Sequence, residues 1–160
     1  MKIAIIGGGI FGVTTAIRLS RNHDVDLFEQ NSDILQSASG INQYRLHRGY
    51  HYPRSTDTAI SAKNSELFFK NEYSSSIVND IDHFYCIANE NSLTNKDQYL
   101  NFCNAVDLSF EETKLDLLNQ NKIDLCVKVV ETLFDPFLLK DICWKKIQEN
   151  NINMHMGKPV

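Results

Sequence analysis

The sequence has no long hydrophobic run and no excess of positive charge. Its longest apolar stretches are far too short to cross a bilayer, and the run Ile3 to Ile6 is too short for the core of a secretory signal. The formal net charge is −4, so no general attraction to nucleic acid is expected. These absences favour a cytoplasmic protein without a transmembrane segment and without a nucleic-acid partner.

The cysteines also lack the spacing of a metal site. None of the four lies in a CxxC pair, and no histidine stands beside one at ligand spacing. No metal is therefore expected, and the thiols are interpreted as reduced, small apolar side chains, which agrees with a cytoplasmic location. They are Cys86, Cys103, Cys126 and Cys143.

What is present is an ordinary globular composition with a distinctive beginning. The 160 residues are 42% hydrophobic and 22% charged, which suits a folded domain with a sizeable core. Residues 2–6 are predicted to form a buried parallel strand that ends in glycines, and residues 10–21 an amphipathic helix. A second short strand over 25–28 ends at Glu29. This order predicts the opening βαβ unit of a nucleotide-binding domain.

The glycine loop between the first strand and the helix carries the clearest chemistry. In a GxGxxG loop, Gly7 permits the tight turn, Gly9 lets a pyrophosphate approach the backbone, and Gly12 lets the helix pack on the strand. The helix N-terminus adds N–H donors and a partial positive charge for the phosphates. The whole loop is predicted to bind the cofactor, including the residues between these glycines: Gly8, Ile10 and Phe11.

An acid closes the second strand at the distance that this motif requires. Glu29 lies 20 residues after Gly9 and suits the two hydroxyls of an adenosine ribose, with Gln30 next to it. The carboxylate would repel a 2′-phosphate, which argues against NADP. The glycine loop and Glu29 alone do not distinguish FAD from NAD. A glycine-rich turn in another α/β protein, with a solvated Glu29, is the structural alternative.

The rest of the chain predicts further elements around one irregular stretch. Residues 31–56 have no period but are rich in Tyr, Arg and His, which favours an ordered, ligand-facing segment over a solvated linker. The next expected elements are a helix over 57–73, capped by Thr56 or Asp57 and with Ile60, Leu67 and Phe68 on its apolar face, and a strand over 82–88.

The second half of the chain begins with a predicted helix from Thr94, whose buried residues are Tyr99, Phe102, Cys103 and Val106. The segment over 109–121 is ambiguous, with a possible short helix at Leu115 and Leu118. A strand over 124–134, a helix capped by Asp135 with Pro136 at its first position, and a strand from Ile152 are expected to follow.

The segment Ser37–Ser55 resembles FAD-dependent oxidoreductases of the D-amino acid oxidase type, a group that includes glycerol-3-phosphate and L-2-hydroxyglutarate dehydrogenases. Its Ser/Gly-rich start and its His47–Ser55 part, similar to H-x-G-x-x-Y-x-P-x-S, carry the resemblance. The stretch Glu131–Pro136, of E-x-x-x-D-P form, also resembles this family, in which it leads back to the FAD domain.

The resemblance implies that FAD is the cofactor and that its flavin N5 takes a hydride from a CH–OH or CH–NH substrate. It implies that four residues lie along the ribityl chain or near the flavin and that His47 lies closest to the ring. Those four are Ser39, Asn42, Gln43 and Arg45. Arg45 and His47 are possible catalytic residues, although Arg45, Arg48 and Arg54 could be solvated charges and His47 could only brace the loop.

The expected fold class is therefore α/β, a Rossmann-like FAD-binding domain with the beginning of an inserted α+β substrate domain. Residues 1–80 and 135–160 are assigned to the FAD domain and 81–134 to the substrate or cap domain. Family members continue well beyond this length, so the chain is interpreted as a fragment, a truncated product or half of a split enzyme. Alone, it is expected to be inactive and prone to self-association.

Two other functions stay open from the sequence. An NAD-binding dehydrogenase would keep the glycine loop and Glu29 but needs regular α/β alternation after residue 30, which the aromatic, basic segment does not offer. A non-catalytic nucleotide-binding remnant would fit a chain without the family's C-terminal half. The sequence does not identify the small-molecule substrate, the electron acceptor, the oligomeric state or any covalent flavin link.

Overall fold

The computed structural model describes residues 1–79 and 81–160, which form two compact units. The first unit contains Met1–Tyr44 and Asp135–Val160, and the second contains Arg45–Phe134. Residues 45–79 thus pack with the segment that follows them. The sequence-based division placed them in the FAD domain, because it grouped residues by expected function. The functional role of each segment remains a prediction.

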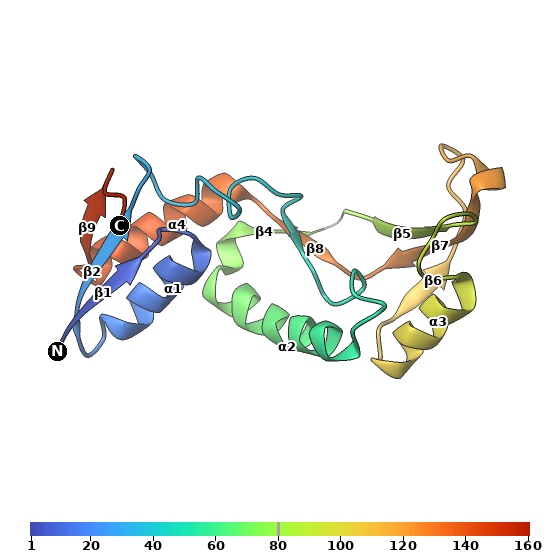
Figure 1. Cartoon of the computed structure of the whole chain (residues 1–160), viewed down its shortest axis with the longest axis horizontal. Coiled ribbons are helices and arrows are strands. Elements are labelled where there is room, and N and C mark those ends of the chain that lie inside the picture. Colours follow the sequence, from blue (N-terminus) through green and yellow to red (C-terminus); the bar gives the residue numbers. More distant parts are fainter. Residues whose placement is uncertain (80) are drawn as a thin grey trace. The chain divides into compact units, whose positions relative to one another are not determined.

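The first unit is a parallel three-stranded sheet with two helices (Figure 1). Its elements in chain order are β1 (Lys2–Ile6), α1 (Ile10–Leu19), β2 (Asp24–Glu29), α4 (Pro136–Glu149) and β9 (Asn153–Met156). The strand order is β1-β2-β9, with both pairs parallel. The predicted βαβ unit and the later helix and strand are confirmed, with ends that differ by one or two residues.

One face of this sheet is packed, and one of its edges is open. Val13, Ala16 and Ile17 of α1 are buried, as are Val25 and Leu27 of β2. Strand β1 pairs only with β2 among the described residues, and its last residue, Ile6, is 67% exposed. An apolar parallel strand at an exposed edge is unusual, because parallel strands are normally buried on both sides.

The opposite face carries a polar and aromatic group that joins β2 to β9. Asp26 Oδ1 lies 2.7 Å from His155 Nε2, and the Phe28 and His155 rings stack with centroids 4.4 Å apart. This contact accounts for His155, which has no place in the predicted site.

Helix α4 begins as its sequence predicts. Asp135 Oδ1 accepts hydrogen bonds from the amides of Phe137 and Leu138, and Pro136 occupies the first turn. The buried side chains of α4 are Leu139, Cys143 and Ile147. Trp144 Nε1 and Lys140 Nζ both donate to Asp33, which ties α4 to the segment after β2.

The second unit is built from two small antiparallel sheets and two helices. One sheet has the order β3-β8-β4 and the other β5-β7-β6. Its elements are β3 (Arg45–Leu46), α2 (Thr56–Glu72), β4 (Ile77–Val78), β5 (His83–Ala88), α3 (Lys96–Ala105), β6 (Phe110–Glu112), β7 (Ile123–Val129) and β8 (Thr132–Phe134), with short 3-10 turns at Ser74–Ser76 and Gln120–Lys122.

The core of this unit lies between α3 and the β5-β7-β6 sheet. The four residues predicted for the apolar face of α3 are all buried, and they pack with Leu125, Val127 and Val129 of β7. Helix α3 starts at Lys96 rather than Thr94, because Asn95 and Gln98 form a reciprocal capping box. The apolar period therefore predicts the buried face of this helix correctly but not the residue at which the helix starts.

One strand prediction in this unit was wrong, and one possible helix is absent from the described residues. The expected strand over 124–134 is divided at Val130–Glu131 into β7 and β8, which belong to different sheets. The division occurs where Glu131 turns inward to bind groups far away in the sequence. The segment over 109–121 forms β6 and a turn rather than a helix at Leu115 and Leu118.

The predicted apolar face of α2 was also wrong. Ser55, not Thr56 or Asp57, caps the helix, and its Oγ accepts from the Thr58 amide. The inward positions of α2 are Ala59 and Glu66, and Glu66 binds Arg48 and Lys70. The three expected core residues, Ile60, Leu67 and Phe68, are exposed in the described chain. No helix among the described residues is long and apolar enough to span a membrane.

Candidate functional site

The glycine loop joins β1 to the start of α1 and can accept no larger residue at its last glycine. Gly7 has φ +99°, and its amide donates to Phe28 O at 2.8 Å. A Cβ on Gly12 would lie 1.9 Å from Gly7 O, so only glycine allows α1 to start this close to β1. The tight turn and the close helix–strand packing thus both require glycine, as the motif predicts.

The N-terminus of α1 is favourable for an anion. Gly9 is the N-cap residue and has no side chain that could cap the helix, and the first turn contains no acidic residue. Ser39 Oγ accepts from the Ile10 amide at 3.1 Å, which brings the Ser/Gly-rich segment against this end of the helix. Backbone N–H groups and the helix dipole favour a phosphate at such a position.

Glu29 lies beside the glycine loop, as its spacing predicts. Its Oε2 accepts from the Gly8 amide at 2.6 Å, and its Oε1 accepts from the backbone amide and side-chain Nδ2 of Asn31, both at 2.8 Å. Burial alone would raise the pKa of Glu29, but the hydrogen bonds from Asn31 and Gly8 lower it below its usual value. The carboxylate is therefore charged at neutral pH and held in a fixed position.

A cavity of about 310 Å³ opens between the glycine loop and the end of β2. It contains four residues predicted for the site, Gly7, Gly9, Glu29 and Gln30. The chain after β9 closes it, because the Lys158 amide donates to Glu29 O and the Gly157 amide to Asn31 O. The remaining lining residues are Ile6, Phe28, Gln36, Ser37, Lys158 and Val160.

Lys158 is a residue of this cavity that the sequence analysis missed. It adds a cationic residue to a lining whose other charged side chain is Glu29 and whose neutral polar side chains are Gln30, Gln36 and Ser37. It lies 129 residues after Glu29, and no motif around it marks a binding residue. Only the pairing of β9 with β2 could have indicated that this segment returns to the end of β2 at Glu29.

Among the other predicted residues of the first unit, Asn42 makes hydrogen bonds within its own loop. Asn42 Nδ2 donates to Ala38 O, and Asn42 Oδ1 accepts from the Tyr44 amide. Tyr44 OH donates to Gly40 O at 2.8 Å. Phe11, Asn42 and Gln43 are exposed, and none of them lines the cavity. The structure does not bring these three residues together with the glycine loop cavity.

Arg45 and His47 belong to the second unit, where one buried carboxylate binds Arg45 and lies near His47. The Glu131 side chain is fully buried, and its Oε2 accepts from Arg45 Nη2 at 2.6 Å. Its Oε1 lies 3.9 Å from His47 Nδ1 and accepts from the Arg48 amide at 3.0 Å. The Tyr85 hydroxyl donates to both oxygens, at 3.2 and 3.3 Å.

These donors determine the charge of Glu131. Burial would raise its pKa, but the neighbouring His47, the hydrogen bond from the Arg48 amide and the charge of Arg45 lower it below the usual value. The Arg45 guanidinium also lies over the Tyr85 ring, 4.6 Å from its centroid. Arg45 is therefore not a solvated loop charge, since one carboxylate and one aromatic ring fix its position.

His47 combines this buried contact with an accessible ring. Its side chain is 31% exposed, and its ring stacks on His51 with centroids 5.1 Å apart. Because Nδ1 is the nitrogen near Glu131, Nε2 is the nitrogen available to another group. Glu131 itself was missed as a site residue, because it lies 86 positions from Arg45 and only the fold brings the two together.

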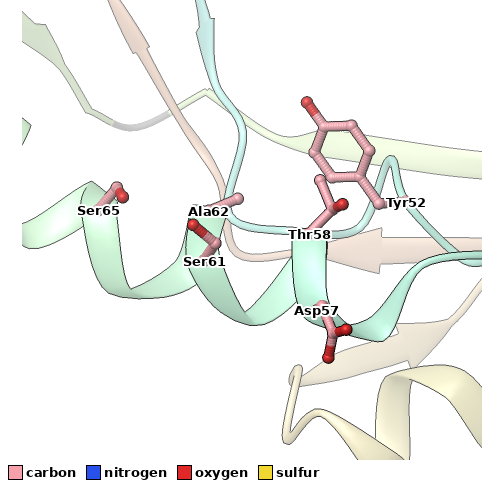
Figure 2. A pocket seen from close by; sticks show the side chains of 6 residues that line it. All are labelled: Tyr52, Asp57, Thr58, Ser61, Ala62 and Ser65. Atoms are coloured by element: carbon pink, nitrogen blue, oxygen red, sulfur yellow. The ribbon is translucent and has the colours of Figure 1, made fainter.

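A separate hollow, in the second unit, does not resemble a nucleotide site. It has a volume of about 420 Å³ and runs along α2, as Figure 2 shows. Ser61, Ala62 and Ser65 line it from α2, together with Tyr52 of the preceding loop and Asp57 and Thr58 of the first turn. Its one charged group is a carboxylate, which disfavours phosphate.

Comparison with known proteins agrees with the geometry of the first unit. The sequence model of the family described as "FAD dependent oxidoreductase" matches residues 2–125. The FAD-dependent monooxygenase FPY4 of Fusarium mangiferae is 31% identical over 129 residues, which are 79% of this chain and 35% of that protein. The FAD-dependent monooxygenase kojA of Aspergillus flavus is 36% identical over 96 residues, 59% of this chain and 22% of that protein.

Solved structures show the same fold. L-α-glycerophosphate oxidase from Mycoplasma pneumoniae superposes with a TM-score of 0.75 at 20% identity, over 99% of this chain and 45% of that one. Glycine oxidase from Geobacillus kaustophilus has a TM-score of 0.77 at 14% identity, over 98% and 46%. The chain thus spans less than half the length of these relatives. The family match gives no support to the NAD alternative, and the chain belongs to the FAD-dependent oxidoreductase family.

Proposed function

We propose that this chain is the part of an FAD-dependent oxidoreductase that holds the adenosine and pyrophosphate of FAD. The observation that carries the proposal is the cavity in which the glycine loop, the acid-free N-terminus of α1 and the charged Glu29 meet. A dinucleotide site needs the helix to pack closely against the first strand. Gly12 provides this packing here, because a Cβ at this position would displace the glycine loop. The residues present therefore fit this end of FAD.

Each part of the cavity has a different proposed task. The amides at the start of α1 bind the pyrophosphate, and Lys158 adds a positive charge at the rim. Glu29 Oε1 already accepts two hydrogen bonds from Asn31, whereas Oε2 accepts one from Gly8. A carboxylate oxygen can accept two, so Oε2 is the oxygen that binds a ribose hydroxyl. This narrows the two-hydroxyl contact expected from the sequence to one direct bond.

When bound, FAD supplies the hydride acceptor. We propose that the hydride donor is a substrate with a CH–OH or CH–NH group. Arg45 and His47 are the proposed residues at the reactive end, with His47 Nε2 toward the ligand. Glu131 keeps Arg45 in place and orients His47 through Nδ1. The cytoplasmic location and the small-molecule substrate class remain parts of this proposal.

The binding part of the proposal is tested by titrating the purified chain with FAD, with ADP and NAD as competitors. We expect saturable binding that ADP reverses, because ADP contains the ribose and pyrophosphate that the cavity recognises. Binding of NAD without any binding of FAD would refute the proposal. A complete protein that includes this chain should purify with flavin absorbance that is released on denaturation.

The placement of His47 needs a separate test in such a complete protein. We expect His47→Ala to change the flavin reduction potential or the single-turnover reduction rate while the fold is retained. His23→Ala, a change at another histidine outside the proposed site, is the control. An unchanged spectrum, potential and rate in the His47 variant would show that His47 is not near the ring. Peroxide formed per substrate oxidised would separate oxidase from monooxygenase chemistry.

A further inference from the structure

Two of the four cysteines face each other across neighbouring strands of the second unit. Cys86 of β5 and Cys126 of β7 are direct partners in the antiparallel register, and their sulfur atoms are 3.1 Å apart. Cys86 is exposed and Cys126 is buried. They lie 40 positions apart in the sequence, so the CxxC spacing that the sequence analysis looked for could not reveal them.

The backbone shows which kind of cross-strand position the pair occupies. Cys126 O accepts a hydrogen bond from the Thr113 amide on the β6 side of β7. The N–H and C=O of a residue in a strand point to the same side, so toward β5 Cys126 is in a non-hydrogen-bonded pair. The Cα atoms of such pairs are about 4.5 Å apart, which lies within the range that a disulfide spans.

The other two cysteines have different surroundings. Cys103 is fully buried on α3 in the core of the second unit, and burial raises its pKa to about 11. Cys143 is fully buried on α4 in the first unit. These two thiols are internal controls, because neither lies in the β5–β7 pair.

We propose that Cys86 and Cys126 form a reversible disulfide-forming site whose oxidant is a peroxide. The Cys86 thiolate attacks the O–O bond of hydrogen peroxide and becomes a sulfenic acid, while the leaving hydroxide takes a proton to give water. The Cys126 thiol then attacks the sulfenic sulfur, forms the S–S bond and releases a second water. Two thiols and one peroxide thus give one disulfide and two waters.

The exposure of Cys86 makes it the residue that attacks the peroxide, and its raised pKa makes the reaction slow. Desolvation, the hydrogen bond and the charge of the neighbouring Cys126 raise the pKa of Cys86 to about 12. Thiolate is therefore scarce at neutral pH, and its fraction increases about tenfold for each pH unit below that pKa. We expect the initial rate of cross-linking to increase about tenfold per pH unit, and so about 100-fold between pH 7 and 9.

The bond would connect β5 and β7, which precede and follow α3 and β6 in the sequence. We expect the oxidised form to show slower backbone hydrogen exchange in β5 and β7, because the cross-link opposes separation of the strands. The exchange of β1 and β2 in the first unit should not change.

The experiment treats the native chain with hydrogen peroxide at pH 8, blocks the remaining thiols and analyses tryptic peptides by mass spectrometry. Trypsin places Cys86 in peptide 71–96 and Cys126 in peptide 123–128. We expect a linked species of these two peptides, two hydrogens lighter than their sum, that dithiothreitol removes. Cys103 and Cys143 should remain blocked by the alkylating reagent.

Two further samples complete the test. Cys86→Ser changes an exposed residue and should abolish the linked species without affecting the fold, which circular dichroism verifies. Chain oxidised in urea should lose the preference for this pair. Oxidation of Cys86 to sulfinic acid without cross-linking, or equal linkage of Cys86 to Cys103 or Cys143 in the native chain, would overturn the proposal.

Discussion

The two units of this chain depend on sequence signals of different range. In the first unit, the glycine loop, α1 and Glu29 follow one another within 30 residues, and short-range patterns predict all of them. In the second unit, the central contact joins Arg45 to Glu131 across 86 positions. Local patterns therefore predict the elements around the glycine loop much better than the group around Arg45 and His47.

The two units are alike in that both expose apolar side chains. Ile6 at the open β1 edge and Phe11 of the glycine loop are exposed in the first unit, and Leu67 and Phe68 on α2 in the second. Parallel sheets are usually covered on both faces, and single exposed apolar side chains are less informative than grouped ones. Both units thus expose surface that a longer relative could cover.

The largest expected effect concerns this surface. We expect the isolated 160-residue chain to self-associate and to have no turnover. Leu67→Lys with Phe68→Lys should reduce the association, whereas Leu117→Lys, at another exposed leucine, should not. Sedimentation velocity would measure the change. A soluble monomer of the unmodified chain with stoichiometric FAD would contradict this prediction.

Glu131→Ala should destabilise the second unit alone. Removing one partner of a buried ion pair leaves an unpaired charge and typically costs about 3–5 kcal/mol. Hydrogen exchange should therefore accelerate in the β3-β8-β4 sheet and leave β1 and β2 unchanged. Equal acceleration in both units would show that they are not separate in stability.

The Glu131 effect should also depend on pH. Because the folded-state pKa is lowered, its stabilising contribution is complete above the unfolded pKa, about 4.3, and is lost as pH falls through the folded value. The difference between wild type and Glu131→Ala should accordingly shrink below about pH 4. A difference that grows with acidification would contradict the assigned charge state.

Gly12→Ala tests the first unit in the same way. The added Cβ would lie 1.9 Å from Gly7 O, and overpacking of this kind typically costs about 1–3 kcal/mol. Exchange should accelerate in β1 and α1, and FAD binding should be lost. Thr15→Ala is the control, because this residue is exposed on the same helix and the change adds no atom near the glycine loop.

Glu29→Ala should have a smaller and more specific effect. A hydrogen bond to a charged group contributes about 1.5–3 kcal/mol, so FAD affinity should fall by about tenfold or more. Glu149→Ala, at an exposed carboxylate of the same unit, should leave the affinity unchanged. Calorimetric titration would measure both variants, and equal affinities would show that Glu29 has another role.

How far the sequence predicted the structure depends on where the deciding contacts lie. The start of α4 and the buried face of α3 were predicted, because capping residues and apolar periods are local. The break after β7 was not, because it depends on the distant partners of Glu131. The expected burial of Phe68 failed for a similar reason, since α2 turns Ala59 and Glu66 inward to meet groups outside the helix.

The central claim is that the first unit holds the adenosine and pyrophosphate of FAD at the glycine loop and Glu29. It is tested most directly by hydrogen exchange of the chain with and without saturating FAD. The account predicts protection over residues 7–13, 29–31 and 156–160, where the loop, the acid and the closing segment meet. Bound FAD with no protection in any of these three segments would contradict it.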